Sequence, residues 1–207
     1  MAKTEHYHTQ LEADCFYHIY NRSIDLKPMF KSHENYHYFL KRYTDYLSGV
    51  VDTYAYCLLG NHFHLLVRVK SKSDLANFRL LTNQKSEMTH DIVSHQFQKF
   101  FQSYAMAFNK QHNRVGTLFQ TPFKRSKIST NDYLVKCVHY IHANPQKHGL
   151  IEDFRDYPWS SYQSYLSEKP TKLRRHEGIE WFEDLFGFLK QHKMMPEDKQ
   201  EDWLIED

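Results

Sequence analysis

Residues 51–70 read VDTYAYCLLGNHFHLLVRVK, and this stretch decides the fold. Its two halves are rich in β-branched and aromatic residues, whereas Gly60 and Asn61 between them form a turn dipeptide. Two strands that are joined by so short a turn pair in the antiparallel sense. The sequence therefore predicts a β-hairpin with strands at 51–59 and 62–70.

Further strands and helices are expected on both sides of this hairpin. Alternating β-forming residues predict a strand at 15–23, and apolar residues at helical spacing predict a helix between Ser32 and Gly49. After the hairpin, the expected elements are a loop or short helix at 71–88, a helix at 91–111, a loop at 112–123, a strand at 124–129, a helix at 133–144 and a weaker helix at about 177–192.

The order of these elements predicts the fold class. Strand, helix, strand, strand, helix, strand, helix is typical of an α+β protein with a ferredoxin-like antiparallel sheet and helices on one face. The last main helix should be capped by Thr130 or Asn131. Pro145 should end it, because the residue before a proline resists helical geometry.

Composition excludes several classes of protein. The mean hydropathy is −0.74, no apolar run is long enough to span a membrane, and the polar start MAKTEHYHTQ does not resemble a signal peptide. The cysteines Cys15, Cys57 and Cys137 are odd in number and widely spaced, so they suit neither a disulfide framework nor a CxxC metal site. We expect a cytoplasmic protein with no membrane partner.

Charge is concentrated in the middle of the chain, although the net charge is only +2. Residues 109–148 hold seven basic residues and one acidic residue, whereas 149–207 hold eight basic and fourteen acidic residues. Lys124, Arg125 and Lys127 follow two phenylalanines, and basic residues interleaved with aromatic ones suit phosphates and unstacked bases. A solvated basic loop is the alternative.

His62-Phe63-His64 is a candidate metal site. Side chains alternate along a strand, so both imidazoles should point to one face, with Cα atoms about 7 Å apart. Two imidazoles so placed can share one metal ion. The chain contains fifteen histidines, however, and such a pair can also arise by chance.

Tyr140 and Asn144 form a second candidate site, because residues four apart share one face of a helix. A phenol is a poor nucleophile at neutral pH, but a divalent metal that polarises a phosphate makes its attack plausible. The Asn144 oxygen could be the third metal ligand. Alternatively, Tyr140 packs in the core and Asn144 caps the helix; Tyr133 is the second candidate nucleophile.

The chain resembles the REP-associated tyrosine transposases, which belong to the HUH single-strand DNA transposase superfamily. The resemblance covers about 16–165 and rests on five pieces of sequence in order. They are FYHIYNRSIDLKPMF (16–30), AYCLLGNHFHLLVRV (55–69), FNKQHNRVGTLFQTPFKRSKI (108–128), YLVKCVHYIHANPQKHGLI (133–151) and DYPWSSYQSY (156–165).

This resemblance implies a metal-dependent enzyme that recognises hairpin DNA, cleaves the single strand next to it, and forms a 5′-phosphotyrosine intermediate. By the motif match, Tyr140 is the nucleophile, and His62 and His64 bind Mg²⁺ or Mn²⁺ on a central strand together with Asn144. His142 and a metal-bound water are candidate general bases. The match predicts a catalytic domain at 1–165. Residues 166–207 have no counterpart in it, and their composition predicts a helical, acidic extension whose last fifteen residues are expected to be disordered.

The sequence is also compatible with other functions. The same fold could serve a domesticated hairpin-binding regulator that does not transpose DNA, or an RNA-binding module that uses the same basic aromatic surface. A monomer and a homodimer with exchanged tyrosine helices are both compatible with the sequence.

Overall fold

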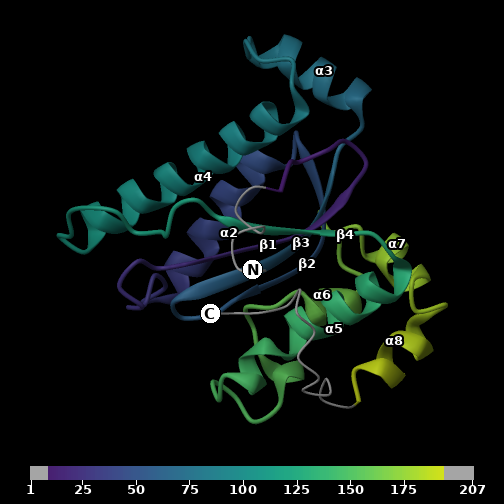
Figure 1. Cartoon of the computed structure of the whole chain (residues 1–207). Helices are drawn as coiled ribbons and strands as arrows, with labels where there is room; N and C mark the ends of the chain where they lie inside the picture. Colours follow the sequence, from purple (N-terminus) through teal and green to yellow (C-terminus); the bar gives the residue numbers. More distant parts are fainter. Residues whose placement is uncertain (1–8, 194–207) are drawn as a thin grey trace, which may run out of the picture.

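The computed structural model describes residues 9–193, and its centre is a four-stranded antiparallel sheet (Figure 1). The strand order is β2-β3-β1-β4, in which every neighbouring pair is antiparallel. The predicted hairpin and the two predicted flanking strands are confirmed. The strands are β1 (Phe16–Arg22), β2 (Val51–Leu58), β3 (His62–Val69) and β4 (Lys124–Ile128).

Two long helices cover one face of the sheet. They are α2 (His33–Leu47) and α4 (Thr89–Gln111), which connect strands of the sheet and pack against each other (Figure 1). The alternation of β3 turns Phe63, Leu65 and Val67 to this side, where they join the apolar residues of both helices in one core. Helix α3 (Lys72–Thr82) follows β3 and precedes α4 in the chain, in the segment expected to be a loop or short helix.

The opposite face is covered by α5 (Asn131–Lys147), so the expectation of helices on one face only is wrong (Figure 1). The crossover helices α2 and α4 share one face, whereas α5 lies on the other. The apolar residues Val138 and Ile141 of α5 pack with Leu66 of β3 in a second core. An amphipathic pattern shows that a helix buries one side, but it does not show which face of a sheet receives it.

The tyrosine-bearing helix α5 also runs past Pro145, which was expected to end it. Its N-cap is Thr130, which is one of the two predicted caps, and its C-cap is His148. The backbone N–H of His148 donates to the carbonyl of Asn144 at 3.0 Å and closes the last turn. The segment from Cys137 to Pro145 is buried throughout, and this packing outweighs the local preference of the residue before proline.

Residues after 165 pack onto the second core. Short helices α7 (Arg175–Glu180) and α8 (Leu185–Gln191) replace the single weak helix expected at 177–192, and η2 (Phe154–Asp156) and α6 (Tyr162–Tyr165) precede them. Phe188 stacks on Tyr165 with ring centroids 4.8 Å apart, and Leu173 bridges to Thr53 of β2. The division at residue 165 stays a prediction, and the expected disorder of the acidic tail concerns residues almost wholly outside the described range.

Within residues 9–193, no helix is both long and apolar enough to cross a membrane.

Candidate active site

The histidine pair lies on the α5 side of the sheet. His62 is the first residue of β3, and alternation places His64 on the same face, with the two ring centroids 5.3 Å apart. Phe63 between them points into the opposite core. The side chains of both histidines are almost fully buried, at 6% and 1% exposure. The strand thus brings two imidazoles together at one place, as the period of two predicts.

Strand β1 adds side chains to the same face, and the sequence interpretation missed these. The antiparallel register sets Tyr20 opposite His64 and Arg22 opposite His62. His18 is buried, and its Nε2 lies 2.9 Å from Nδ1 of His64. The spacing of two between His18, Tyr20 and Arg22 indicates that they share one face of β1. Only the register of β1 against β3 shows that this face also carries the histidine pair.

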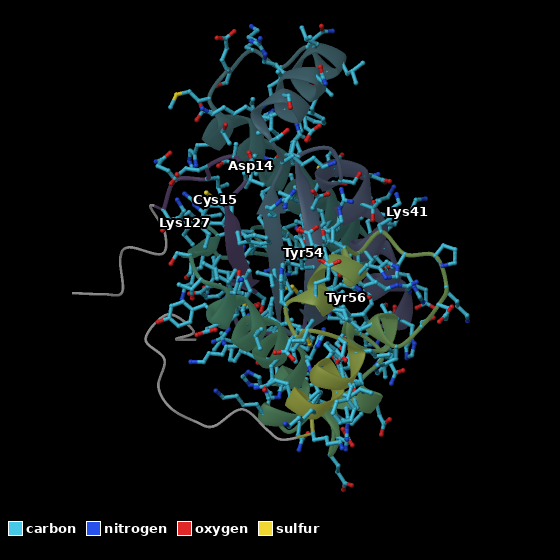
Figure 2. The ribbon with its side chains drawn as sticks, turned by 90° about the vertical axis from the view of Figure 1, so that its right-hand side faces the viewer. Asp14, Cys15, Lys41, Tyr54, Tyr56 and Lys127 are labelled. Carbon is cyan, nitrogen blue, oxygen red and sulfur yellow. The ribbon has the colours of Figure 1, made fainter. Side chains whose placement is uncertain are left out.

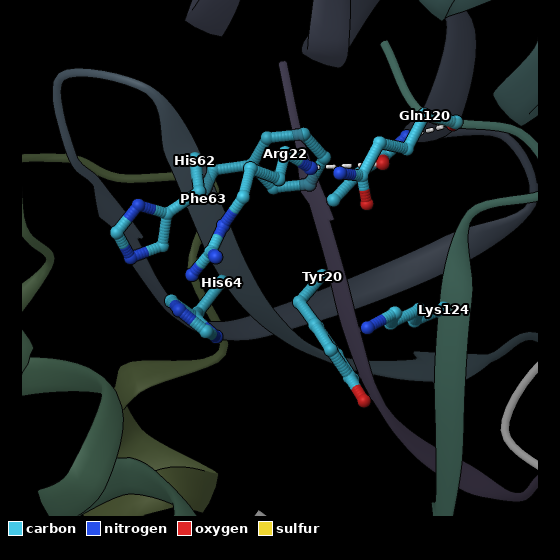
Figure 3. Close-up of a pocket in the computed structure, with 8 residues that line it drawn as sticks. Tyr20, Arg22, His62, Phe63, His64, Gln120 and Lys124 are labelled. Carbon is cyan, nitrogen blue, oxygen red and sulfur yellow. Dashed lines mark hydrogen bonds between the residues drawn. The ribbon is translucent and has the colours of Figure 1, made fainter. Parts of the chain in front are cut away.

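A pocket opens beside the pair, and Figure 3 shows the side chains that line it. Arg22 and Lys124 bring positive charge, and the Lys124 ammonium lies 5.7 Å from the centre of the Tyr20 ring. None of the described residues that line the pocket is acidic, so the pocket suits an anion such as a phosphate. The pocket is lined by Tyr20, Asn21, Arg22, His62, Phe63, His64, Gln120 and Lys124.

Helix α5 supplies the third side of the site. Its ring contacts place Tyr140 against His64 at 5.7 Å between centroids and against His18 at 5.9 Å. Two turns further on, His148 lies 4.8 Å from His62 by the same measure. One face of α5 therefore lies along the histidine pair, because residues four apart in a helix share a face.

Asn144 lies between these two contacts on the same face of α5. Asn144 is fully buried, and it lies within the last turn of α5 and not at the C-cap, which is His148. Its amide nitrogen is 3.4 Å from the carbonyl oxygen of Tyr140, and its Oδ1 has no hydrogen-bond partner among residues 9–193. A buried carbonyl oxygen without a partner is unfavourable unless something else binds it.

The described residues contain no cluster of three or more histidine, cysteine, aspartate or glutamate side chains that could hold a metal. A cation bound by His62 and His64 would need a ligand of another kind. The Asn144 amide oxygen is such a ligand, and oxygen and imidazole nitrogen together suit several divalent ions.

His142 does not face Tyr140, which removes it as a candidate base. It points into the second core, where Nδ1 lies 3.0 Å from Nε2 of His192 and Nε2 lies 2.7 Å from Oγ of Ser161. Burial is the main cause that lowers the pKa of His142 well below its usual value, with repulsion from His192 as a second cause.

The competing nucleophile, Tyr133, stands in the first turn of α5. Its side chain is 39% exposed, and the Lys136 ammonium lies over its ring at 5.7 Å. The ring contact with His64 belongs to Tyr140. Of the two candidate tyrosines, Tyr140 is therefore the one beside the candidate metal ligands.

The three basic residues of β4 do not form one surface. Lys124 joins the pocket, whereas alternation sends Arg125 and Lys127 to the opposite face. Arg125 is 6% exposed and donates to the carbonyl of Thr9 at 2.5 Å, and burial lowers its pKa. Lys127 lies 2.9 Å from a carboxylate oxygen of Glu12, and Figure 2 shows it in the same region as Asp14 and Cys15.

Sequence comparison finds a curated relative over about half of the chain. A Haemophilus influenzae protein, named provisionally as a REP-associated tyrosine transposase, is 30% identical over 113 residues. The resemblance to the REP-associated tyrosine transposases is confirmed. The match covers 54% of this chain and 58% of the relative, which is less than two thirds of that transposase. No family model matches the chain.

A solved structure supports the fold of these transposases for the chain. It is the structure of a REP-associated tyrosine transposase bound to a REP hairpin. The two structures align with a TM-score of 0.53 over 78% of this chain and 86% of the other, at 16% sequence identity. At this identity the match establishes the shared mixed α/β architecture of antiparallel sheet and helices.

Proposed function

We propose that the protein is a metal-dependent single-strand DNA endonuclease and strand transferase in which Tyr140 is the nucleophile. The observation that carries the proposal is the packing of the Tyr140 ring against His64, with Asn144 one helical turn away. The nucleophile and the metal ligands would then approach one phosphate from two elements, β3 and α5.

The candidate ligands fit a divalent cation. His62, His64 and Asn144 would hold Mg²⁺ or Mn²⁺, and the buried Asn144 oxygen without a hydrogen-bond partner in residues 9–193 supports this assignment. When bound, such an ion draws negative charge from the phosphate and makes attack by a protonated phenol feasible. Arg22 and Lys124 would bind the phosphate oxygens from the pocket side.

The proposed reaction exchanges one phosphodiester for another. The Tyr140 phenol oxygen bonds to the phosphorus and loses its proton, and the bond from phosphorus to the 3′ oxygen breaks. The leaving oxygen takes up a proton and becomes a 3′-hydroxyl, while the 5′-phosphate stays on Tyr140. Because the ester conserves the energy of the broken bond, the strand can be rejoined without a nucleotide cofactor.

We propose hairpin DNA as the substrate class, since the solved transposase with this architecture is bound to a REP hairpin. Bases and phosphates next to the hairpin would enter the pocket lined by Tyr20 and Lys124. Tyr140 contacts His64 of its own chain, and this supports a site that one chain can complete without exchanging helices with a second copy.

The test is adduct formation with a labelled hairpin that has a single-stranded flank, in the presence of Mg²⁺ or Mn²⁺. We expect a protein–DNA adduct on a denaturing gel with the wild type and no adduct with Tyr140→Phe, since this variant lacks only one hydroxyl. Tyr133→Phe is the matched control on the same helix and should retain the adduct.

Other outcomes would assign the site differently. An adduct with Tyr140→Phe but none with Tyr133→Phe would identify Tyr133 as the nucleophile. Tight hairpin binding without any adduct from the wild type would favour a domesticated DNA-binding regulator. Equal binding of a matched RNA hairpin would point to an RNA-binding module.

A further inference from the structure

Each histidine of the candidate metal pair is held at its Nδ1 atom by a different side chain. Nδ1 of His62 lies 2.7 Å from Oδ1 of Asn61, and Nδ1 of His64 lies 2.9 Å from Nε2 of His18. We propose that Asn61 and His18 are positioning residues that fix His62 and His64 as Nε2 ligands of a divalent cation. This inference rests on the proposed function.

Asn61 determines which nitrogen of His62 carries the proton. The amide nitrogen of Asn61 donates to the carbonyl of Leu26 at 2.9 Å, so the amide oxygen is the atom that faces His62. An amide oxygen only accepts, and Nδ1 of His62 must therefore donate its N–H. A neutral imidazole has one N–H, so the lone pair that can coordinate a metal is on Nε2.

His18 differs from Asn61, because an imidazole nitrogen can donate or accept. If His18 donates to His64, the His64 proton sits on Nε2 and coordination there is blocked. If His64 donates through Nδ1, its Nε2 carries the lone pair and His18 holds its own proton on Nδ1. Binding of a cation at Nε2 of His64 therefore selects the second arrangement, in which His18 is the acceptor.

Packing keeps the His18 ring in the orientation that this role requires. His18 is 1% exposed and stacks on Tyr20 with centroids 4.9 Å apart, and its ring also lies nearly parallel to that of His64. The neighbouring rings thus restrict rotation of the imidazole. A partner that fixes both the proton and the ring plane of a ligand typically affects metal affinity about 10- to 100-fold.

The inference can be tested by titrating Mn²⁺ into the full chain and measuring free Mn²⁺ by electron paramagnetic resonance. Asn61→Leu and His18→Phe remove the acceptors but keep similar side-chain volumes, and each should weaken Mn²⁺ binding about 10- to 100-fold. Asn61→Asp and His18→Gln return an acceptor, so each should recover most of the lost affinity.

A second measurement reports the tautomers without any metal. Nitrogen-15 NMR of the ring nitrogens should show His62 with its proton on Nδ1 in the wild type, and a mixture of tautomers in Asn61→Leu. A purely structural role for Asn61 would leave this signature unchanged. Thermal unfolding of all variants controls for loss of the fold.

The possible failures are distinguishable. A wild type that binds no Mn²⁺ would overturn the proposed metal-dependent function and this inference with it. A wild type that binds Mn²⁺, together with Asn61→Leu and His18→Phe variants that bind it equally well, would overturn the positioning roles alone. His62→Ala, which removes a proposed ligand, provides the reference for full loss of the site.

Discussion

The two faces of the sheet are built from the same strands but serve different purposes. On the side of α2 and α4, Ile19 and Phe63 belong to a continuous apolar core. On the side of α5, the next residues along the strands are His18 and His64, which are equally buried but hydrogen-bonded to each other. Neighbours in sequence therefore belong to opposite environments.

This comparison teaches that burial alone does not distinguish the core from the site. An apolar side chain contributes by leaving water, whereas a buried imidazole is tolerated only when its nitrogens have partners. Phe63 and its neighbours on the α2 and α4 face should therefore contribute to stability alone, whereas the histidines on the α5 face should determine the chemistry.

The largest difference is expected between alanine substitutions at two adjacent residues of β3. Phe63→Ala should lower the free energy of unfolding by about 3–5 kcal/mol, because a fully buried ring leaves a cavity. His64→Ala should lower it by about 1–3 kcal/mol, since His18 loses a buried partner, yet it should abolish adduct formation. Urea unfolding and the hairpin adduct assay would measure the two effects.

Phe63→Ala should retain adduct formation under conditions in which it is folded. If His64→Ala proved the more destabilising of the two while cleavage persisted, the separation of the faces would be refuted.

The α5 face should also make stability depend on pH. Burial lowers the pKa of His142, and it lowers that of His192 to about 3, so both are neutral when folded. The unfolded chain takes up protons on these residues below about pH 6.5, and the stabilising contribution is therefore present above that pH and lost below it. For His192 alone the loss should reach about 2 kcal/mol at about pH 5.

Urea unfolding at several pH values would measure this dependence. His192→Gln should flatten the profile between about pH 5 and about pH 6.5, because the group that takes up the proton is gone. His95→Gln, which changes an exposed histidine of α4, is the matched control and should keep the wild-type slope. A slope unchanged in His192→Gln would show that other groups cause the acid sensitivity.

The smallest expected effect separates the basic residues of β4. Lys124→Ala should reduce hairpin affinity a few-fold and lower the slope of log affinity against log salt by about 0.7–0.9, as one lost phosphate contact does. Lys127→Ala, on the opposite face and paired with Glu12, should leave that slope unchanged. Equal effects in a salt titration would place DNA on both faces.

Much of the fold could be predicted from the sequence because its signals are local. The short turn at Gly60 and Asn61 defines the central hairpin, and alternation defines the strand ends. The face covered by α5 and its continuation past Pro145 could not be predicted, since both depend on packing between elements distant in sequence. The pairing of Leu173 with Thr53 is equally non-local.

In the candidate site too, the local relations could be predicted and the long-range ones could not. The shared face of His62 and His64 follows from strand period, and that of Tyr140 and Asn144 from helix period. The place of His18 beside His64 requires the register of β1 against β3, which the sequence does not specify. Lys124, Arg125 and Lys127 appear as one cluster in sequence, but strand alternation divides them between the two faces.

The parts of the candidate site are synthesised at different times, because they lie far apart in the chain. The histidine pair is made early, whereas α5, which packs onto β2 and β3, lies beyond α4 and β4 in the chain. A nascent chain that still lacks α5 carries the proposed metal ligands of β3 without the proposed nucleophile. Under this proposal, DNA-cleaving activity would begin only when translation has passed Tyr140 and the last main helix has docked.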